Sequence, residues 1–304
     1  METRSHMRLQ AVAAAGAMGL VGLAMGIFVW FSPAEAGLTG RILIAGYGPE
    51  LPVFQDLGKA FEKSHPGTAV DFDWERTVKA VDLVRAGTAD LAVTDRLVPG
   101  LRETRVAWDG IAVVVNFANP IREISRGQLR DIFTGRVTRW SDMDGSSAKI
   151  QLFDRAPEDN VKAGFETSLG IVGQVLRSAT VVRTDQKALR AVSGNTEAVT
   201  YLSLAAALQA QEDGIPVQLL TIDQVEPGQP TVKDGSYPLR RPVYLISREN
   251  SGAVAEAFIA FARSTEAESL LRTVFVPSGA SASREAKAPG LPTDSPHPAH
   301  DKES

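Results

Sequence analysis

The alternation of short apolar runs with helical patterns between residues 41 and 94 constrains the fold more than any other feature of the sequence. The apolar runs have strand length, and the segments between them carry apolar residues at helical spacing. Strands that alternate with helices pair in parallel, because each helical crossover returns the chain to the same edge of the sheet. We therefore predict an α/β fold with mixed, mostly parallel sheets and helices on both faces. The predicted order is strand 41–45, helix 51–61, strand 70–74, helix 78–84 and strand 91–93.

The side chains that build most catalytic and metal sites are scarce. The 304 residues include no cysteine, which excludes disulfides and thiolate chemistry. Of the four histidines, only His65 lies away from the chain ends, and it precedes Pro66-Gly67 in a helix-stop sequence, so we predict a capping or solvent-exposed role. Gly-x-Ser-x-Gly and Walker-type loops are also missing. We therefore expect no catalytic residue, no metal and no cofactor.

The net charge of the chain and the composition of its two ends indicate which partners it can have and where it is located. A formal net charge of -4 argues against nucleic acid as a partner. The apolar run over residues 11–31 follows two arginines and is long enough to cross a bilayer core of about 30 Å. We predict that residues 1–36 are a signal peptide cleaved after Ala36, or a retained anchor that contacts the membrane, and that the remaining chain is periplasmic or extracellular. Residues 279–304, rich in proline and charge, are predicted to be a disordered tail.

The loops that follow the predicted strands are the first candidates for a binding site. Ligands of parallel α/β sheets bind at the carboxyl ends of the strands, and these three loops should converge on one edge. The alternative is that each loop is only a polar connection between buried elements. The candidate ligand contacts in these loops are Tyr47, Gly48, Glu75, Arg76, Thr94 and Asp95.

Two longer motifs further along the chain are specific: AWDGIAVVVN at residues 107–116 and SYPLRRPVY at residues 236–244. Shorter matches are Asn119-Pro120, QLRDIFTGR at 128–136, RWS at 139–141, Tyr201 to Leu204, and a closing helix predicted from Ser251 to Thr273. In this order and spacing the segments resemble the periplasmic phosphate-binding proteins of phosphate ABC transporters. The resemblance covers nearly the whole of the predicted folded part, from about residue 42 to about residue 277.

This resemblance implies a two-lobe fold of the type II periplasmic binding proteins, with two crossover strands as the hinge. The strand over 111–115 is similar to the first crossover, and the strand over 242–245 to the second. Lobe one would then comprise residues 38–112 and 243–278, and lobe two residues 113–242. A ligand in the cleft would hold the lobes closed, because it binds the closed state more tightly.

The resemblance also implies a phosphate site built from neutral donors, one arginine and one aspartate. Arg155 matches the family's arginine, and Asp95, which follows Thr94, matches its aspartate. Where the family has Gly-Ser-Gly-Thr, this chain has Glu-Asp-Asn-Val at 158–161, so Asp159 and Asn160 replace small donors. A carboxylate about 4 Å from a phosphate oxygen costs on the order of 4 kcal/mol at an effective dielectric of about 20. We therefore expect weakened phosphate binding, with ion pairing of Arg155 and Asp95 as the alternative role.

Two functional hypotheses remain open. The first is an exported, monomeric binding protein that delivers phosphate or another small solute to the permease of an ABC importer. The second is a diverged, membrane-tethered binding or sensor module that takes a protein partner or a non-phosphate ligand. The mixed charges of the candidate loops suit a ligand that carries both signs of charge, or one that carries a proton. An exported hydrolase is disfavoured because its motifs are missing.

Overall fold

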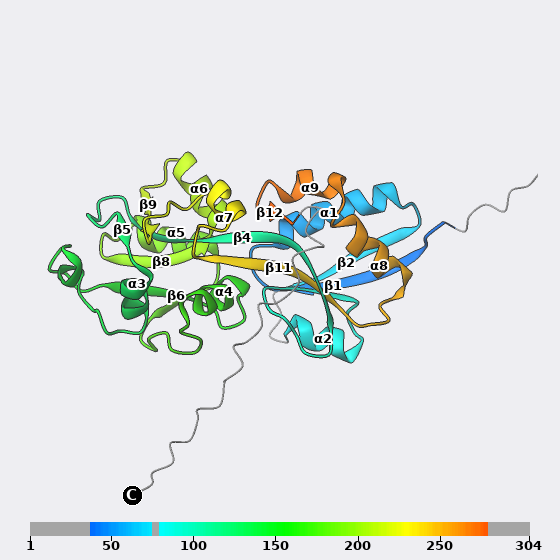
Figure 1. Cartoon of the computed structure of the whole chain (residues 1–304), viewed down its shortest axis with the longest axis horizontal. Helices are drawn as coiled ribbons and strands as arrows, with labels where there is room; N and C mark the ends of the chain where they lie inside the picture. The colour runs from blue at the N-terminus through cyan, green and yellow to red at the C-terminus, as the bar shows by residue number, and fades with distance from the viewer. Residues whose placement is uncertain (1–36, 75–78, 279–304) are drawn as a thin grey trace, which may run out of the picture. The chain divides into compact units, whose positions relative to one another are not determined.

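The structure, a computed structural model, describes residues 37–74 and 79–278 (Figure 1). The predicted signal or anchor at 1–36, the tail at 279–304, and the candidate residues Glu75 and Arg76 lie outside the described residues. No helix within the described ranges is long and apolar enough to cross a membrane. The strands are β1 (Gly40–Gly46), β2 (Thr68–Trp74), β3 (Leu91–Thr94), β4 (Arg102–Asn116), β5 (Glu123–Ile124), β6 (Gln151–Arg155), β7 (Thr180–Val182), β8 (Ala198–Ser203), β9 (Val217–Leu219), β10 (Thr221–Ile222), β11 (Arg240–Ser247) and β12 (Val276–Pro277). The helices are α1 (Leu51–Ser64), α2 (Ala80–Ala86), α3 (Arg126–Phe133), α4 (Asn160–Leu169), α5 (Asp185–Ser193), α6 (Leu204–Glu212), α7 (Gln229–Asp234), α8 (Gly252–Phe261) and α9 (Thr265–Leu271), with a 3₁₀ turn, η1 (Trp140–Met143).

The strand–helix alternation predicted at the start of the fold is confirmed, since β1 pairs in parallel with both β2 and β3. Helix α1 covers this sheet and buries Phe54, Leu57 and Phe61 completely. Burial of each such side chain contributes about 1.5–3 kcal/mol. The helix ends at His65, whose backbone N–H donates to the Phe61 carbonyl (2.8 Å) and whose ring stacks on Phe61. The capping role predicted for His65 is therefore confirmed.

Strands β4 and β11 run through both halves of the folded part and connect them (Figure 1). Strand β4 has 15 residues and, at about 3.3 Å per residue, extends for about 50 Å. It pairs antiparallel with β11, β8, β9 and β12, and β11 pairs antiparallel with β3. The sheet is therefore parallel in its outer parts, as predicted, but antiparallel around the two connecting strands, because β11 returns the chain in the opposite direction to β4.

Two large hydrophobic clusters lie on either side of this connection. One is drawn from residues 42–107 and 243–275, and the other mainly from residues 111–239. The boundary between the two clusters falls within β4 and at the start of β11. These are the two predicted crossover strands. This is the two-lobe arrangement expected of a type II periplasmic binding protein; we use the predicted residue boundaries of the lobes as a proposal.

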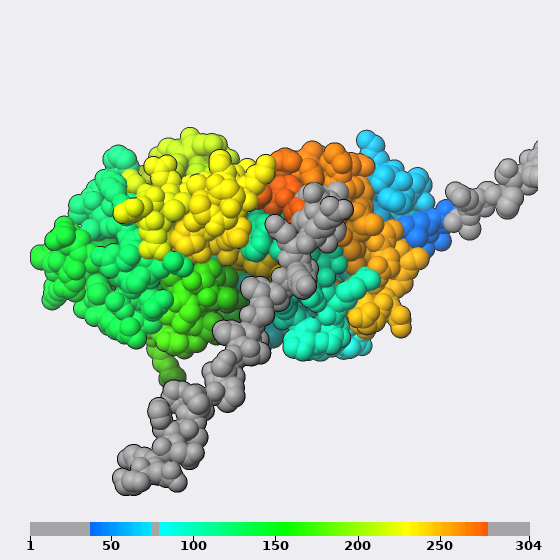
Figure 2. Space-filling view, in the orientation of Figure 1, coloured from blue at the N-terminus to red at the C-terminus, as the bar shows by residue number. Residues whose placement is uncertain are grey.

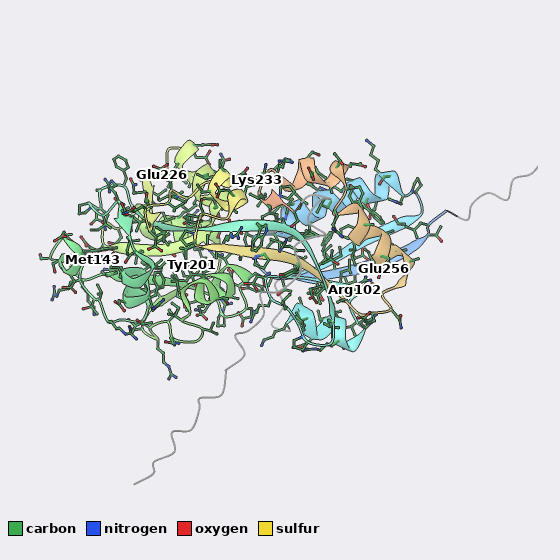
Figure 3. All side chains as sticks on the ribbon, in the orientation of Figure 1. Arg102, Met143, Tyr201, Glu226, Lys233 and Glu256 are labelled. Carbon is green, nitrogen blue, oxygen red and sulfur yellow. The ribbon has the colours of Figure 1, made fainter. Side chains whose placement is uncertain are left out.

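Local contacts hold each lobe and link the two. In lobe one Arg102 at the start of β4 pairs with Glu256 of α8, and in lobe two the ring of Tyr201 stacks on Phe165 (3.8 Å between centroids) (Figure 3). Across the lobes Gln229 of α7 donates to the Arg272 carbonyl (3.3 Å). Figure 2 shows yellow and orange surfaces, from the two lobes, in contact at the top of the view.

The prediction of one closing helix from Ser251 to Thr273 is wrong. The segment forms α8 and α9, which are separated by a short turn. Ser264 has extended backbone dihedrals, and its hydroxyl accepts a hydrogen bond from the Ala267 N–H (3.2 Å). A serine in this geometry starts a new helix, because its side chain satisfies a backbone donor that has no partner within the helix.

Helix α4 of lobe two packs directly on strand β11 through Gly164. A Cβ atom at Gly164 would lie 2.7 Å from Cδ and 2.8 Å from Cβ of Arg241. Arg241 is 1% exposed and its guanidinium is bound by two carboxylates, so its side chain has little freedom to move aside. Gly164 therefore permits the close approach of α4 to the connecting strand.

We expect Gly164→Ala to lower the free energy of unfolding by about 1–3 kcal/mol, because the added methyl group overpacks the contact with Arg241. Urea denaturation followed by circular dichroism measures this change. The matched control is Gly127→Ala in α3, whose added Cβ meets only Ser125 at 3.7 Å. That control should leave stability unchanged or raise it slightly, as alanine favours helix. Equal stability of the two variants would contradict the packing argument.

Candidate functional site

The loops that follow β1, β3 and β6 meet between the lobes. Asn160, the first residue of α4, donates its side-chain amide to the Tyr47 carbonyl (2.9 Å) and more weakly to the Val93 carbonyl (3.5 Å). The candidate loop after β1 and the strand β3 therefore contact the start of α4 directly. We call this region, where these three loops meet β4 and β11, the interlobe seam.

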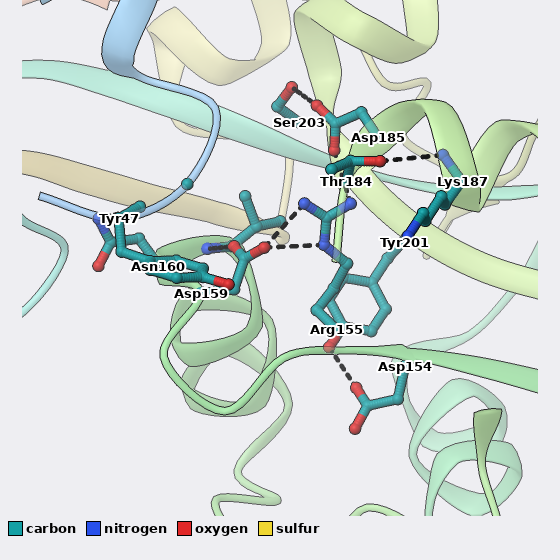
Figure 4. A network of polar contacts seen from close by, with 12 residues as sticks. Tyr47, Asp154, Arg155, Asp159, Asn160, Thr184, Asp185, Lys187, Tyr201 and Ser203 are labelled. Carbon is teal, nitrogen blue, oxygen red and sulfur yellow. Dashed lines mark hydrogen bonds and ion pairs between the residues drawn. The ribbon is translucent and has the colours of Figure 1, made fainter. Parts of the chain in front are cut away.

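Arg155, the last residue of β6, is 2% exposed and pairs with two carboxylates (Figure 4). Its Nε and Nη2 donate to Asp159 Oδ2 at 2.9 and 2.7 Å, and its Nη1 donates to Asp185 Oδ1 at 2.6 Å. The expectation of an ion-paired Arg155 is confirmed, but its partners are Asp159 and Asp185 and not Asp95.

Both aspartates lie at helix N-termini, where anions are stabilised by free N–H groups and by the helix dipole. Asp159 is the N-cap of α4, and its Oδ1 accepts from the Val161 N–H (2.8 Å). Asp185 is the first residue of α5, and its Oδ2 accepts from the Ser203 hydroxyl at 3.4 Å. The chain's own carboxylates thus take the position that a bound anion would take at these helix ends.

A second buried arginine, Arg241 of β11, organises the other side of the seam. It donates Nη2 to Glu50 Oε1 (2.5 Å), and Nε and Nη2 to Asp109 Oδ2 (3.1 and 2.7 Å). All three residues are at most 1% exposed. Glu50 is the N-cap of α1 but makes no side-chain capping bond, because its carboxylate is used by Arg241. This ion pair joins α1 of lobe one to both connecting strands.

Three carboxylate oxygens in the seam lack a hydrogen-bond partner in the described part of the chain: Glu50 Oε2, Asp109 Oδ1 and Asp95 Oδ1. Asp95 Oδ1 lies 3.4 Å from Arg96 Nε, which is an ion-pair distance without hydrogen-bond geometry. Burial raises the pKa of Glu50 to about 7 and that of Asp109 to about 6, although Arg241 opposes both shifts. Burial also raises the pKa of Asp95. The seam therefore carries five carboxyl groups around two guanidinium groups, and some of these acids hold a proton near neutral pH.

The predicted site residues that the structure describes fall into two groups. Arg155 and Asp159 pair directly, Asn160 follows at the start of α4, and Tyr47 contributes a carbonyl. Gly48 has a φ of +111°, and an added Cβ would lie 2.8 Å from Glu50 Oε2, so its role as a ligand contact also stays a prediction. Asp95 lies toward Arg241 and Thr94 lines an adjoining pocket. Their roles as ligand contacts stay a prediction.

Four charged residues of the seam were not among the sequence candidates: Glu50, Asp109, Asp185 and Arg241. Weak signals existed, since Arg241 and Asp109 lie in the two long motifs and Asp185 follows a threonine at a helix start. Metal binding finds no support here, because no group of three or more histidine, aspartate or glutamate side chains within the described ranges could hold an ion.

Comparison with known proteins agrees with this architecture. A family model described as the PBP superfamily domain matches residues 32–266. "Phosphate-binding protein PstS" of Staphylococcus haemolyticus is 25% identical over 236 residues, covering 70% of this chain and 72% of that protein. "Phosphate-binding protein PstS 2" of Streptococcus agalactiae is 32% identical over 111 residues, and the match spans only 38% of that relative's length.

Solved structures give the same result. An ABC-type phosphate transport receptor from Vibrio cholerae superposes with a TM-score of 0.70 at 26% identity, covering 78% of this chain and all of that one. A putative phosphate ABC transporter substrate-binding protein from Clostridium perfringens, with bound phosphate, has a TM-score of 0.69 at 21% identity and covers 78% of this chain and 99% of its own; at that identity it supports the fold alone. The two-lobe fold, the paired connecting strands and the family match together show that this chain belongs to the PBP superfamily and resembles the phosphate-binding components of ABC importers.

Proposed function

We propose that this chain is an exported solute-binding component of an ABC importer, with a binding rather than a catalytic role, and that Arg155 receives a small oxyanion of the phosphate type. The observation that carries the proposal is Arg155 itself, a guanidinium 2% exposed at the seam between two hinged lobes and beside the N-termini of α4 and α5. The phosphate named for the relatives and the permease partner of such receptors support it.

The affinity of Arg155 for an oxyanion depends on competition with the carboxylates that already pair with it. Three of the five N–H donors of the Arg155 guanidinium are used by Asp159 and Asp185, so an incoming oxyanion competes with both carboxylates for this group. A carboxylate that stays about 4 Å from the ligand costs on the order of 4 kcal/mol at an effective dielectric of about 20. We therefore expect phosphate binding to be weaker than about 1 μM in the wild type.

The second candidate is a module of this fold that binds no oxyanion and engages a protein partner, with the seam as a permanent lobe-to-lobe contact. The pairing of Arg155 with two carboxylates and the direct bond from Asn160 to the Tyr47 carbonyl favour it. In that case phosphate should produce neither heat nor a change in the radius of gyration.

The contribution of the seam to stability depends on pH, because two carboxyl groups, Glu50 and Asp109, are buried against the same arginine, Arg241. A carboxyl group whose pKa is raised in the folded state binds its proton more tightly there than in the unfolded chain. For Glu50 the shift runs from 4.5 to about 7. Its contribution to stability is thus full below pH 4.5 and is lost as the pH rises to about 7.

We expect Asp159→Ser to bind phosphate at least about tenfold more tightly than the wild type, since it removes one carboxylate, frees two donors of Arg155 and keeps an N-cap hydroxyl. Arg155→Ala should abolish binding. Isothermal titration with inorganic phosphate measures both effects. Asp131→Ser is the matched control, because Asp131 forms a surface pair with Arg136 far from the seam. If Arg155→Ala binds like the wild type, or if no variant binds phosphate, the oxyanion assignment fails.

We expect the free energy of unfolding to fall by about 1–3 kcal/mol between about pH 5 and about pH 8 through Glu50. Asp109, with its pKa raised to about 6, adds to the same trend. Glu50→Gln keeps an acceptor for Arg241 but cannot titrate, so its stability should change less over this range. Chemical denaturation at several pH values tests this, and an identical pH profile for variant and wild type would show that Glu50 titrates normally.

A further inference from the structure

A pocket of about 340 Å³ lies beside the seam and is separate from the Arg155 pairs. Its wall in lobe one comes from Tyr47, α2 and the loop after β3, and its wall in lobe two from Pro157, Glu158 and Asn160. Neither Arg155 nor Asp159 lines it. The volume leaves room for roughly a dozen water-sized groups at about 30 Å³ each, which exceeds the needs of inorganic phosphate.

One side of the pocket is basic, since Lys79, Arg85 and Arg96 line it. The two guanidinium groups make only long contacts with the described residues. Arg96 lies 3.4 Å from Asp95, with a side chain 54% exposed. Arg85 reaches Asp82 Oδ1 at 3.4 Å and the Pro99 carbonyl at 3.5 Å. These guanidinium groups retain donors that can bind a carboxylate from a ligand.

The opposite wall carries an unsatisfied acid. Glu158 lines the pocket from lobe two, and its Oε2 is buried without a hydrogen-bond partner in the described residues. A buried carboxylate oxygen with no partner is costly, and such a group in a native protein indicates a missing donor. A positively charged group of a ligand would supply that donor.

Apolar side chains complete the pocket. Val81, Leu97, Val98 and Pro99 line it between the charged walls. Leu97 is 62% exposed, so its side chain is accessible to a ligand in this pocket. A ligand that fits therefore has an apolar body as well as charge.

We propose that this pocket binds a small zwitterion, of the size of an aromatic amino acid or a dipeptide, with its ammonium group at Glu158, its carboxylate at Arg96 and Lys79, and its apolar side chain against Leu97. The inference rests on the proposed receptor function, because the pocket has walls from both lobes. It adds a second ligand class beside Arg155, and the two charges of the ligand match charges that the protein leaves weakly paired.

The test is isothermal titration of the full chain with L-phenylalanine and with glycyl-L-leucine. We expect saturable binding of at least one of them, and binding at least about tenfold weaker for N-acetyl-L-phenylalanine, which lacks the ammonium group, and for L-phenylalaninamide, which lacks the carboxylate. Glu158→Gln should weaken binding of the zwitterion at least about tenfold. Glu212→Gln, on the exposed side of α6, is the matched control and should bind like the wild type.

Failure of either proposal can be recognised separately. No saturable binding of either zwitterion, or equal binding by Glu158→Gln, overturns this inference. Because Glu158 Oε2 makes no hydrogen bond within the described residues, the melting temperature of Glu158→Gln should not fall below that of the wild type, which distinguishes lost binding from misfolding. Phosphate binding that depends on Arg155, without zwitterion binding, leaves the proposed function intact. Zwitterion binding that depends on Glu158, without phosphate binding, removes only the oxyanion assignment.

Discussion

Two buried guanidinium groups, those of Arg155 and Arg241, determine how the interior between the lobes is arranged. An arginine in such a place must be matched by carboxylates, since removal of one partner from a buried pair costs about 3–5 kcal/mol. Arg241 pairs with Glu50 and Asp109, and Arg155 pairs with Asp159 and Asp185. The Arg241 pairs join α1 to both connecting strands, and the Arg155 pairs join β6 to the starts of α4 and α5. The close contact of Gly164 with Arg241 depends on the position of this arginine.

This arrangement changes what a receptor of this fold can bind. A site of neutral donors accepts an anion without competition, whereas here the N-termini of α4 and α5 already hold carboxylates of the chain. An anion at Arg155 competes with these carboxylates, while the pocket beside the seam offers both signs of charge and an apolar wall. Burial also keeps part of the acid protonated near neutral pH, so the charge of the seam depends on pH.

Local patterns explain which parts of the fold could be predicted. The order β1, α1, β2, α2, β3 follows from apolar periodicity and from stop signals such as Gly87, which adopts the left-handed conformation at the end of α2. The break between α8 and α9 was missed, although Ser264 followed by Glu266 and Glu268 in the first turn of α9 is a helix-start signal. The partners of Arg241 were missed because Glu50 and Asp109 lie 191 and 132 positions away along the chain.

The amino-acid sequence by itself determined the fold family, the alternating elements and the replacement of small donors by Asp159 and Asn160, because these depend on residue type and short-range spacing. Only the tertiary structure decided which carboxylate each arginine binds, that Glu158 has a buried unpaired oxygen, and that a pocket lies beside the seam. The physical reason is that burial and ion pairing depend on residues that β4 and β11 bring together from distant parts of the chain. Short-range sequence patterns contain no information about such contacts.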